Sequence, residues 1–312
     1  FHLMQNISEA LAGRIGIMEL AGLSMRECMG DGFNKHFLPT LEYVAERRKT
    51  LQKPENIWEM IHKGGYPELQ DGNKEWSSFY ADYVKTYIER DVRELAAVQD
   101  LNVFRQFMIA AAARTGEILN YSAIASEIGK DVGTVKKWMS ILEASGIVYL
   151  LEPFTSNILK RAIKSPKLYF RDTGLVCYLT RWLTSENLAY GAMSGPVFET
   201  FVVSEILKSY ANEGLDYRYF VSYYRGRDKK RVKKDGETLE IEAEIDLIIE
   251  ENGILYPIEI KKNTQAKAIM TSAFAVLDEI SGKKRGMGAV ICNCPDVGAL
   301  RENILQIPVW YI

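Results

Sequence analysis

The chain has 312 residues, 47% of them hydrophobic and 26% charged, a length that exceeds one ordinary hydrophobic core and predicts two or three domains. The formal net charge of −2 excludes attraction to nucleic acid by overall charge, so any such contact must come from local basic patches. No apolar run reaches the length of a membrane span and the first residues lack a signal-peptide pattern, which predicts a cytoplasmic protein without membrane contact.

Residues 1–100 divide into a short first segment and a helical one. Residues 1–27 end in a strand-like run from Arg14 to Leu20. From Asn34 to Asp100 the pattern is helical, with a break at residues 64–67, Gly-Gly-Tyr-Pro. Its later helix carries apolar side chains three and four residues apart, which we expect to be buried: Phe79, Tyr80, Tyr83, Tyr87, Ile88, Val92 and Leu95. Residues 28–100 are therefore predicted to be a helical linker.

Residues 101–190 have the pattern of a winged helix and its following connection. We expect helices over 104–114, 122–129 and 132–144, then strands over 147–151 and 167–170. Ser122 and Asp131 are the predicted caps of the second and third helices, and Gly146 ends the third.

In the winged-helix module the third helix enters the major groove and the wing contacts phosphates. The candidate DNA contacts are Thr134, Lys136 and Lys137 on that helix, and Lys160 and Arg161 in the wing. The same lysines are also typical of a solvated helix face, and winged helices also serve as docking modules for proteins.

The last domain is predicted over residues 191–312. It begins with an amphipathic helix, Pro196 to Tyr210, that carries Glu199, and a strand over 217–223 follows. Residues 225–234 then hold seven basic residues against one aspartate, so Arg227, Lys229 and Lys230 are candidates for contacts with a phosphate backbone. The alternative is a solubilising loop at a hairpin tip.

Residues 240–262 contain two runs rich in isoleucine and leucine around Asn252-Gly253, a pair that favours a two-residue type I′ hairpin. This turn places Asp246 opposite Glu259 and Glu244 opposite Lys261. Strict alternation predicts one core face, made of Ile245, Leu247, Ile249, Tyr256, Ile258 and Ile260.

The two facing carboxylates have Cβ atoms about 4.5 to 5.5 Å apart and repel each other. The pair therefore requires a cation between the acids, a protonated carboxyl group, or splayed strands with water between them. A charged face that is simply wet is the alternative. Beyond the hairpin we expect a helix over 266–280 and strands over 288–293 and 307–312. The four cysteines, Cys292 and Cys294 included, are expected to be core thiols and not zinc ligands.

An aspartate followed by Glu-X-Lys on the next strand resembles the motif of PD-(D/E)XK nucleases. The resemblance implies that Asp246 and Glu259 bind Mg²⁺ or Mn²⁺ and that Lys261 positions the attacking water. Glu199 matches the further acidic residue of many members, whereas Ile245 stands where the motif has proline. The order helix, three strands, helix, strand also matches the core of these nucleases.

The whole chain resembles the C-terminal portion of prokaryotic AAA-type ATPases with a conserved C-terminal region. The similar segments are Leu11–Arg14, Tyr87–Asp91, Ala113–Gly116, Lys167–Gly174, Phe198-Glu199 and the Asp246, Glu259 and Lys261 set. Leu11–Arg14 resembles the end of a P-loop ATPase domain, in which Arg14 approaches the nucleotide or forms a surface ion pair. No G-x-x-x-x-G-K-[ST] occurs in the 312 residues, so ATP is expected only in an intact, longer protein.

The sequence thus predicts an α+β multidomain chain: a helical linker and winged helix-turn-helix, then an α/β PD-(D/E)XK nuclease-like (restriction endonuclease-like) domain. The first functional hypothesis is an ATP-linked, DNA-directed protein with Mg²⁺-dependent phosphodiester cleavage. The second is a non-catalytic switch or assembly protein that binds a protein partner. The third is a transcription regulator that uses only the winged helix. The oligomeric state is left open.

Overall fold

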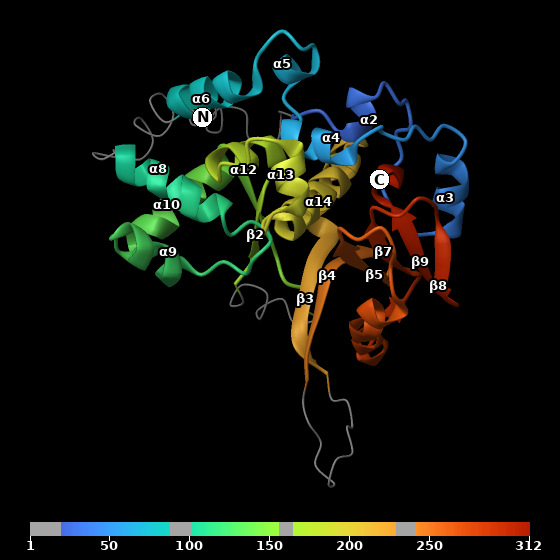
Figure 1. Cartoon of the computed structure of the whole chain (residues 1–312). Coiled ribbons are helices and arrows are strands. Elements are labelled where there is room, and N and C mark those ends of the chain that lie inside the picture. Colours follow the sequence, from blue (N-terminus) through green and yellow to red (C-terminus); the bar gives the residue numbers. More distant parts are fainter. Residues whose placement is uncertain (1–19, 88–100, 156–164, 229–240) are drawn as a thin grey trace, which may run out of the picture.

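The computed structural model describes residues 20–87, 101–155, 165–228 and 241–312. It is an α+β protein with a helical N-terminal region and a mixed sheet in its C-terminal region (Figure 1). Several predictions lie outside the described residues: the segment with Leu11–Arg14, the stripe beyond Tyr87, the wing residues Lys160 and Arg161, and Lys229 and Lys230. Every helix in the described ranges falls short of the length and apolarity needed to cross a lipid bilayer.

Five short helices form the first part of the structure. They are α2 (Met25–Cys28), α3 (Leu41–Arg47), α4 (Ile57–Lys63), α5 (Pro67–Gln70) and α6 (Trp76–Tyr87). The predicted break is present, because Gly64 caps α4 with a φ of 82° and Pro67 begins α5. The apolar stripe is also confirmed on α6, where Phe79, Tyr80 and Tyr87 are buried.

The second part is made of three helices and a two-stranded antiparallel sheet. Its elements are α8 (Leu101–Ala112), α9 (Tyr121–Ile128), α10 (Val132–Ala144), β1 (Val148–Leu151) and β2 (Lys167–Phe170). Asp131 caps α10 as predicted, its side chain accepting from the Thr134 N–H group. The predicted cap of α9 is wrong: Asn120, not Ser122, accepts the N–H group of Ala123, since the cap lies two residues earlier.

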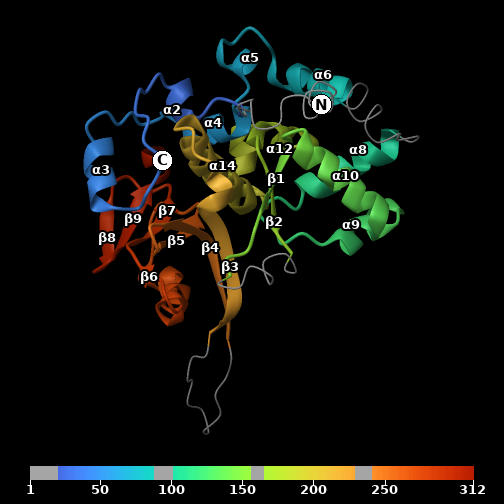
Figure 2. The same cartoon turned by 180° about the vertical axis from the view of Figure 1, so that it is seen from behind.

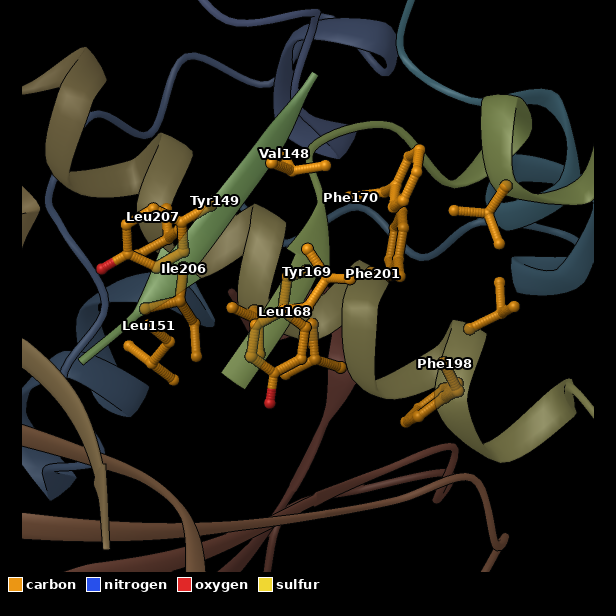
Figure 3. Packing of buried hydrophobic residues seen from close by; sticks show 14 of the residues in the cluster. Val148, Tyr149, Leu151, Leu168, Tyr169, Phe170, Phe198, Phe201, Ile206 and Leu207 are labelled. Carbon is orange, nitrogen blue, oxygen red and sulfur yellow. The ribbon is translucent and has the colours of Figure 1, made fainter. Parts of the chain in front are cut away.

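Helix α14 (Ser194–Asn212) is the central helix of the molecule, and α12 (Thr173–Leu179) and α13 (Ser185–Tyr190) precede it. Viewed from either side, it lies between the helices and the sheet (Figures 1 and 2). Figure 3 shows Phe198, Phe201, Ile206 and Leu207 of α14 beside the strands β1 and β2. The burial of α14 extends beyond the apolar side that the sequence predicts, because polar residues such as Glu205 and Lys208 are buried as well.

The large sheet has the strand order β3-β4-β5-β7-β9-β8, with the short β6 beside β5. Its strands are β3 (Val221–Asp228), β4 (Ile241–Glu251), β5 (Ile254–Lys261), β6 (Lys284–Arg285), β7 (Gly288–Cys292), β8 (Gly298–Arg301) and β9 (Ile304–Pro308). Strands β3, β4 and β5 are antiparallel, whereas β5, β7 and β9 are parallel.

Three elements in this region differ from the prediction in type or in bounds. Residues Tyr217–Tyr219 form a 3₁₀ turn, η2, before β3 begins. Residues Ala268–Glu279 form a 3₁₀ helix, η3, and not an α-helix. The last predicted strand ends at Pro308, where a 3₁₀ turn, η4 (Val309–Tyr311), follows, because proline cannot donate to a neighbouring strand.

One continuous hydrophobic core runs from Met25 to Ile312 and includes residues of α4, α8, α14 and the sheet. A second, smaller core lies between the sheet and η3, with Phe274 and Leu277 at its centre. Apolar side chains therefore cover both faces of the central strands.

Candidate active site

The hairpin between β4 and β5 has the predicted turn and, next to that turn, the predicted register, but the predicted pairs Asp246 with Glu259 and Glu244 with Lys261 lie beyond the ladder. Asn252 and Gly253 adopt φ values of 51° and 78°, as a type I′ turn requires. Pairing runs from Glu251 with Ile254 to Leu247 with Ile258 and ends there. Beyond this last pair, the N–H group of Ile260 donates to Oδ2 of Asp246 at 2.8 Å. The Asp246 carboxylate therefore accepts a backbone donor at the point where the ladder stops.

A bulge in β4 reverses the predicted faces of the strand beyond this point. Ser222 pairs with Ile248 but Tyr224 pairs with Ile245, so Asp246 and Leu247 together oppose one residue of β3. As a result Ile245 packs in the core beside η3, whereas Leu247 lies in the main core. The prediction that Ile245 shares a face with Leu247, Ile249, Tyr256, Ile258 and Ile260 is wrong, because strict alternation assumes a strand without an inserted residue.

Lys261 joins the two carboxylates of the predicted motif. Its Nζ lies 2.6 Å from Oε1 of Glu259 and 3.3 Å from Oδ2 of Asp246. The side chains of Asp246 and Glu259 are only 10% and 12% exposed. The two acids are therefore buried and not simply wet, and the ammonium group of Lys261 is a cation that lies against both of them.

Strand β2 adds two more side chains to these acids. The hydroxyl of Tyr169 donates to Oε1 of Glu199 at 2.6 Å. Nζ of Lys167 lies 2.7 Å from Glu244, 3.4 Å from Glu199 and 3.7 Å from Asp246. Glu199 comes from α14, so three separate parts of the chain meet here. We refer to Glu199, Glu244, Asp246, Glu259, Lys167 and Lys261 as the acidic site.

Burial and mutual repulsion raise the pKa values of two carboxyl groups in the acidic site. Burial, and then the charge of Asp246, raise the pKa of Glu199 to about 7 and that of Glu259 to about 8. Burial alone would lower the pKa of Lys261, yet Asp246 and Glu259 raise it above its usual value. The site therefore has an excess of acids over ammonium groups and favours additional positive charge.

The donor chemistry of the acidic site fits Mg²⁺ or Mn²⁺, which prefer carboxylate oxygens. Asp246 and Glu259 are the residues that would hold such an ion, with Glu199 beside them. Among the described residues, however, no group of three or more histidine, cysteine, aspartate or glutamate side chains is arranged to hold a metal ion. The ammonium groups of Lys261 and Lys167 lie against these oxygens instead, so a divalent ion must exchange with lysine contacts.

The predicted nucleic-acid contacts are separate from the acidic site. Lys136 and Lys137 are exposed on α10, which lies on the far side of β2 from the sheet (Figure 1). Nζ of Lys136 lies over the ring of Tyr121 at 5.6 Å. The hydroxyl of Thr134 bonds Oδ2 of Asp131 and so takes part in the cap of α10. Arg227 is in β3, where its backbone pairs with Glu242.

Asp172 and Gly174, at the end of the similar segment Lys167–Gly174, have a structural role. The Asp172 carboxylate caps α12 through the Leu175 N–H group and also accepts from the N–H group of Gly65 and the hydroxyl of Tyr80. A Cβ on Gly174 would lie 2.1 Å from that hydroxyl. This segment therefore fastens α12 to α6 and to the end of α4.

Lys167 and Tyr169 are absent from the predicted site, because the sequence predicts residues 167–170 only as a strand. One signal was available: a lysine that begins a strand of otherwise buried apolar and aromatic residues needs an acidic partner. Its partners, on α14 and β4, lie more than thirty residues away in the sequence and become neighbours only on folding.

Comparisons with known proteins identify two regions of the chain. Residues 54–186 match a domain of unknown function, DUF8612, and residues 194–312 match a second one, DUF4143. Uncharacterised proteins of Mycobacterium bovis and Mycobacterium tuberculosis are each 25% identical over 273 residues, which cover 87% of this chain. The chain spans about half the length of these curated relatives, 52%. Its C-terminal region, with most of the acidic site, is thus similar to a domain found in AAA-ATPase-associated proteins.

Proposed function

We propose that the acidic site cleaves phosphodiester bonds in nucleic acid with the help of Mg²⁺ or Mn²⁺. The observation that carries the proposal is the contact of Lys261 with both Glu259 and Asp246, beside Glu199. Two acids and a lysine in this arrangement are the groups that metal-assisted hydrolysis of a phosphodiester uses. The proposal includes an ATPase in the same longer protein, supported by the similarity of residues 194–312 to DUF4143.

Each residue of the site has a role in this proposal. Asp246 and Glu259 hold the divalent ion, and Glu199 supplies a third acidic group from α14. When bound, the ion polarises the phosphate and lowers the pKa of a bound water. Lys261, whose side chain is 36% exposed, faces both the acids and the solvent, so it can orient the water and offset charge that develops on the phosphate.

The same proposal interprets the folds of both parts. Helices α8, α9 and α10 with strands β1 and β2 have the order of a winged helix. Helix α14, antiparallel β3, β4 and β5, then η3 and the parallel strand β7 have the order of the PD-(D/E)XK core. We assign duplex binding to the first part and cleavage to the second.

A nuclease assay tests the catalytic proposal. Purified chain is incubated with several DNA and RNA forms and Mg²⁺ or Mn²⁺, and Asp246→Ala and Lys261→Ala are each expected to lower cleavage at least about a hundredfold. Lys283→Ala is the matched control, since Lys283 also pairs with a glutamate of β4, Glu250, away from the acidic site. Equal rates in the wild type, Asp246→Ala and Lys261→Ala would refute catalysis by this site.

Duplex binding is tested on α10. We expect Lys136→Ala combined with Lys137→Ala to weaken duplex binding and to reduce the slope of log affinity against log salt by about 1 to 2, because each phosphate contact releases counterions. Fluorescence anisotropy at several salt concentrations measures both quantities. Lys267→Ala with Lys284→Ala removes the same charge from exposed positions elsewhere. If both double variants bind like the wild type, α10 does not contact DNA.

A non-catalytic assembly protein is the second candidate, and it is favoured by the lysine contacts that already neutralise part of the acidic site. In this case the acids and lysines form a structural ion-pair network, and the chain binds a protein partner. Calorimetric titration separates the two candidates. Binding of Mn²⁺ that is lost in Glu259→Gln supports the catalytic proposal, whereas no binding of Mg²⁺ or Mn²⁺ supports the second.

A further inference from the structure

Lys167 is the most deeply buried cation of the acidic site. Its side chain is 3% exposed and enters from β2, outside the hairpin that carries the predicted motif. Three carboxylates surround its Nζ: Glu244 at 2.7 Å, Glu199 at 3.4 Å and Asp246 at 3.7 Å. These three close carboxylates stabilise the charged form of the buried ammonium group.

A second buried lysine shows what is unusual about this arrangement. Lys208 of α14 bonds a single carboxylate, Glu205, at 2.8 Å and the carbonyl oxygen of Leu23 at 2.9 Å. That is a structural ion pair with a backbone acceptor. Lys167, in contrast, lies where three carboxylates from two elements converge, which is the arrangement of oxygen ligands that surrounds a bound divalent cation.

Lys261 and Lys167 also differ in their freedom to move. Lys261 is 36% exposed and ends β5, so its ammonium group can turn into solvent when an ion enters. Lys167 is enclosed, and its neighbour on the same face of β2, Tyr169, donates to Glu199. An ion can therefore replace the contacts of Lys261 but not those of Lys167.

We infer that Lys167 is a fixed cation of the acidic site and supplies the positive charge that a second metal ion supplies in two-metal phosphodiesterases. The inference rests on the proposed metal binding and states its stoichiometry: one divalent ion, held by Asp246 and Glu259, per chain. The ammonium group lies 3.4 Å from Glu199 and 3.7 Å from Asp246, so it would repel a second ion placed between these two acids.

The test is a titration with Mn²⁺ alone, followed by calorimetry and by the electron paramagnetic resonance signal of free Mn²⁺. Wild-type protein is expected to bind one equivalent. Lys167→Met is expected to bind a second equivalent, or to bind the first at least about tenfold more tightly, because a charge of +1 has been removed. Lys167→Arg, which retains the charge, is expected to bind one equivalent.

Stability in a chelator gives a second readout. Lys167→Met is expected to lower the melting temperature, because Glu199, Glu244 and Asp246 lose their counter-charge. Excess Mn²⁺ should then raise the melting temperature of Lys167→Met by more than it raises that of the wild type. Lys208→Met is the matched control: it also removes a buried ammonium group, but Mn²⁺ should not restore its stability. If Lys167→Met does not fold, the same titration is made with Lys167→Met combined with Glu244→Gln.

The possible outcomes separate this inference from the proposed function. If the wild type binds two equivalents of Mn²⁺, or if the wild type and Lys167→Met bind Mn²⁺ identically, the fixed cation is overturned while metal binding stands. Binding by Lys167→Met but not by the wild type supports the fixed cation and refutes metal-dependent cleavage by the natural chain. No binding by either protein refutes both.

Discussion

Glu259 is a carboxyl group whose ionisation opposes folding. Its pKa rises from the usual 4.5 to about 8 in the folded chain, first through burial and then through the charge of Asp246. A raised folded-state pKa means that the folded chain binds a proton more tightly than the unfolded chain. The tighter proton binding by Glu259 therefore stabilises the folded chain fully below pH 4.5, and this contribution is lost as the pH rises through 8. Glu199, with a pKa of about 7, acts in the same direction.

We therefore expect the free energy of unfolding, measured by urea denaturation in a chelator, to fall between about pH 5 and pH 8. Glu259→Gln, which cannot ionise, should reduce that slope. Glu302→Gln is the control, because Glu302 is exposed and outside the acidic site. A slope that stays the same in Glu259→Gln would show that Glu259 ionises in the folded chain as easily as in the unfolded one.

The turn of the β4–β5 hairpin sets the pairing of the two strands that carry Asp246, Glu259 and Lys261. Gly253 has a φ of 78°, a conformation that costs an L residue about 1 to 2 kcal/mol. We expect Gly253→Ala to lower the free energy of unfolding by about 1 kcal/mol, as measured by chemical denaturation. Gly195→Ala in the first turn of α14 is the opposite case: no atom lies within 4 Å of its added Cβ, and it should stabilise by about 0.5 kcal/mol. Equal destabilisation by both would contradict the turn as the cause.

The bulge in β4 is an element that local patterns do not reveal. Residues 243–249 alternate well enough to predict a regular strand, and the inserted residue depends on how β3 pairs with β4. Because Asp246 and Leu247 together oppose Tyr223, Ile245 packs in the core beside η3 whereas Leu247 lies in the main core. Asp246 then contacts Lys167 of β2 in addition to Lys261.

The first helices and the end of the sheet are joined by buried arginines. Nε of Arg26 donates to the carbonyl oxygen of Ile312 at 2.9 Å, and Arg47 pairs with Asp31 at 2.5 Å where both side chains are 2% exposed. Arg47 also approaches the carbonyl oxygen of Trp310 at 3.4 Å. Because one hydrophobic core runs through the same region, the helical and sheet regions are expected to unfold together.

Scanning calorimetry tests this expectation. Arg47→Met leaves Asp31 buried without its counter-charge, which should cost about 3 to 5 kcal/mol and lower the temperature of one transition for the whole chain. The control is Arg285→Met, which breaks the more exposed pair with Asp278 and should cost less than about 1 kcal/mol. Two separate transitions, of which Arg47→Met shifts only one, would contradict a shared core.

Local patterns in the sequence identify the type I′ turn, the cap of α10, the strands of the two hairpin arms and β2, because hydrogen bonds and φ values of neighbouring residues control these features. They also place Asp246, Glu259 and Lys261 together, since a two-residue turn sets the pairing of its strands. The contribution of Lys167 and Tyr169, the bulge in β4 and the burial of α14 on all sides arise from contacts between distant segments. Packing of β2 and α14 against the sheet brings those charges within 4 Å, and no local preference of β2 or of α14 contains that information.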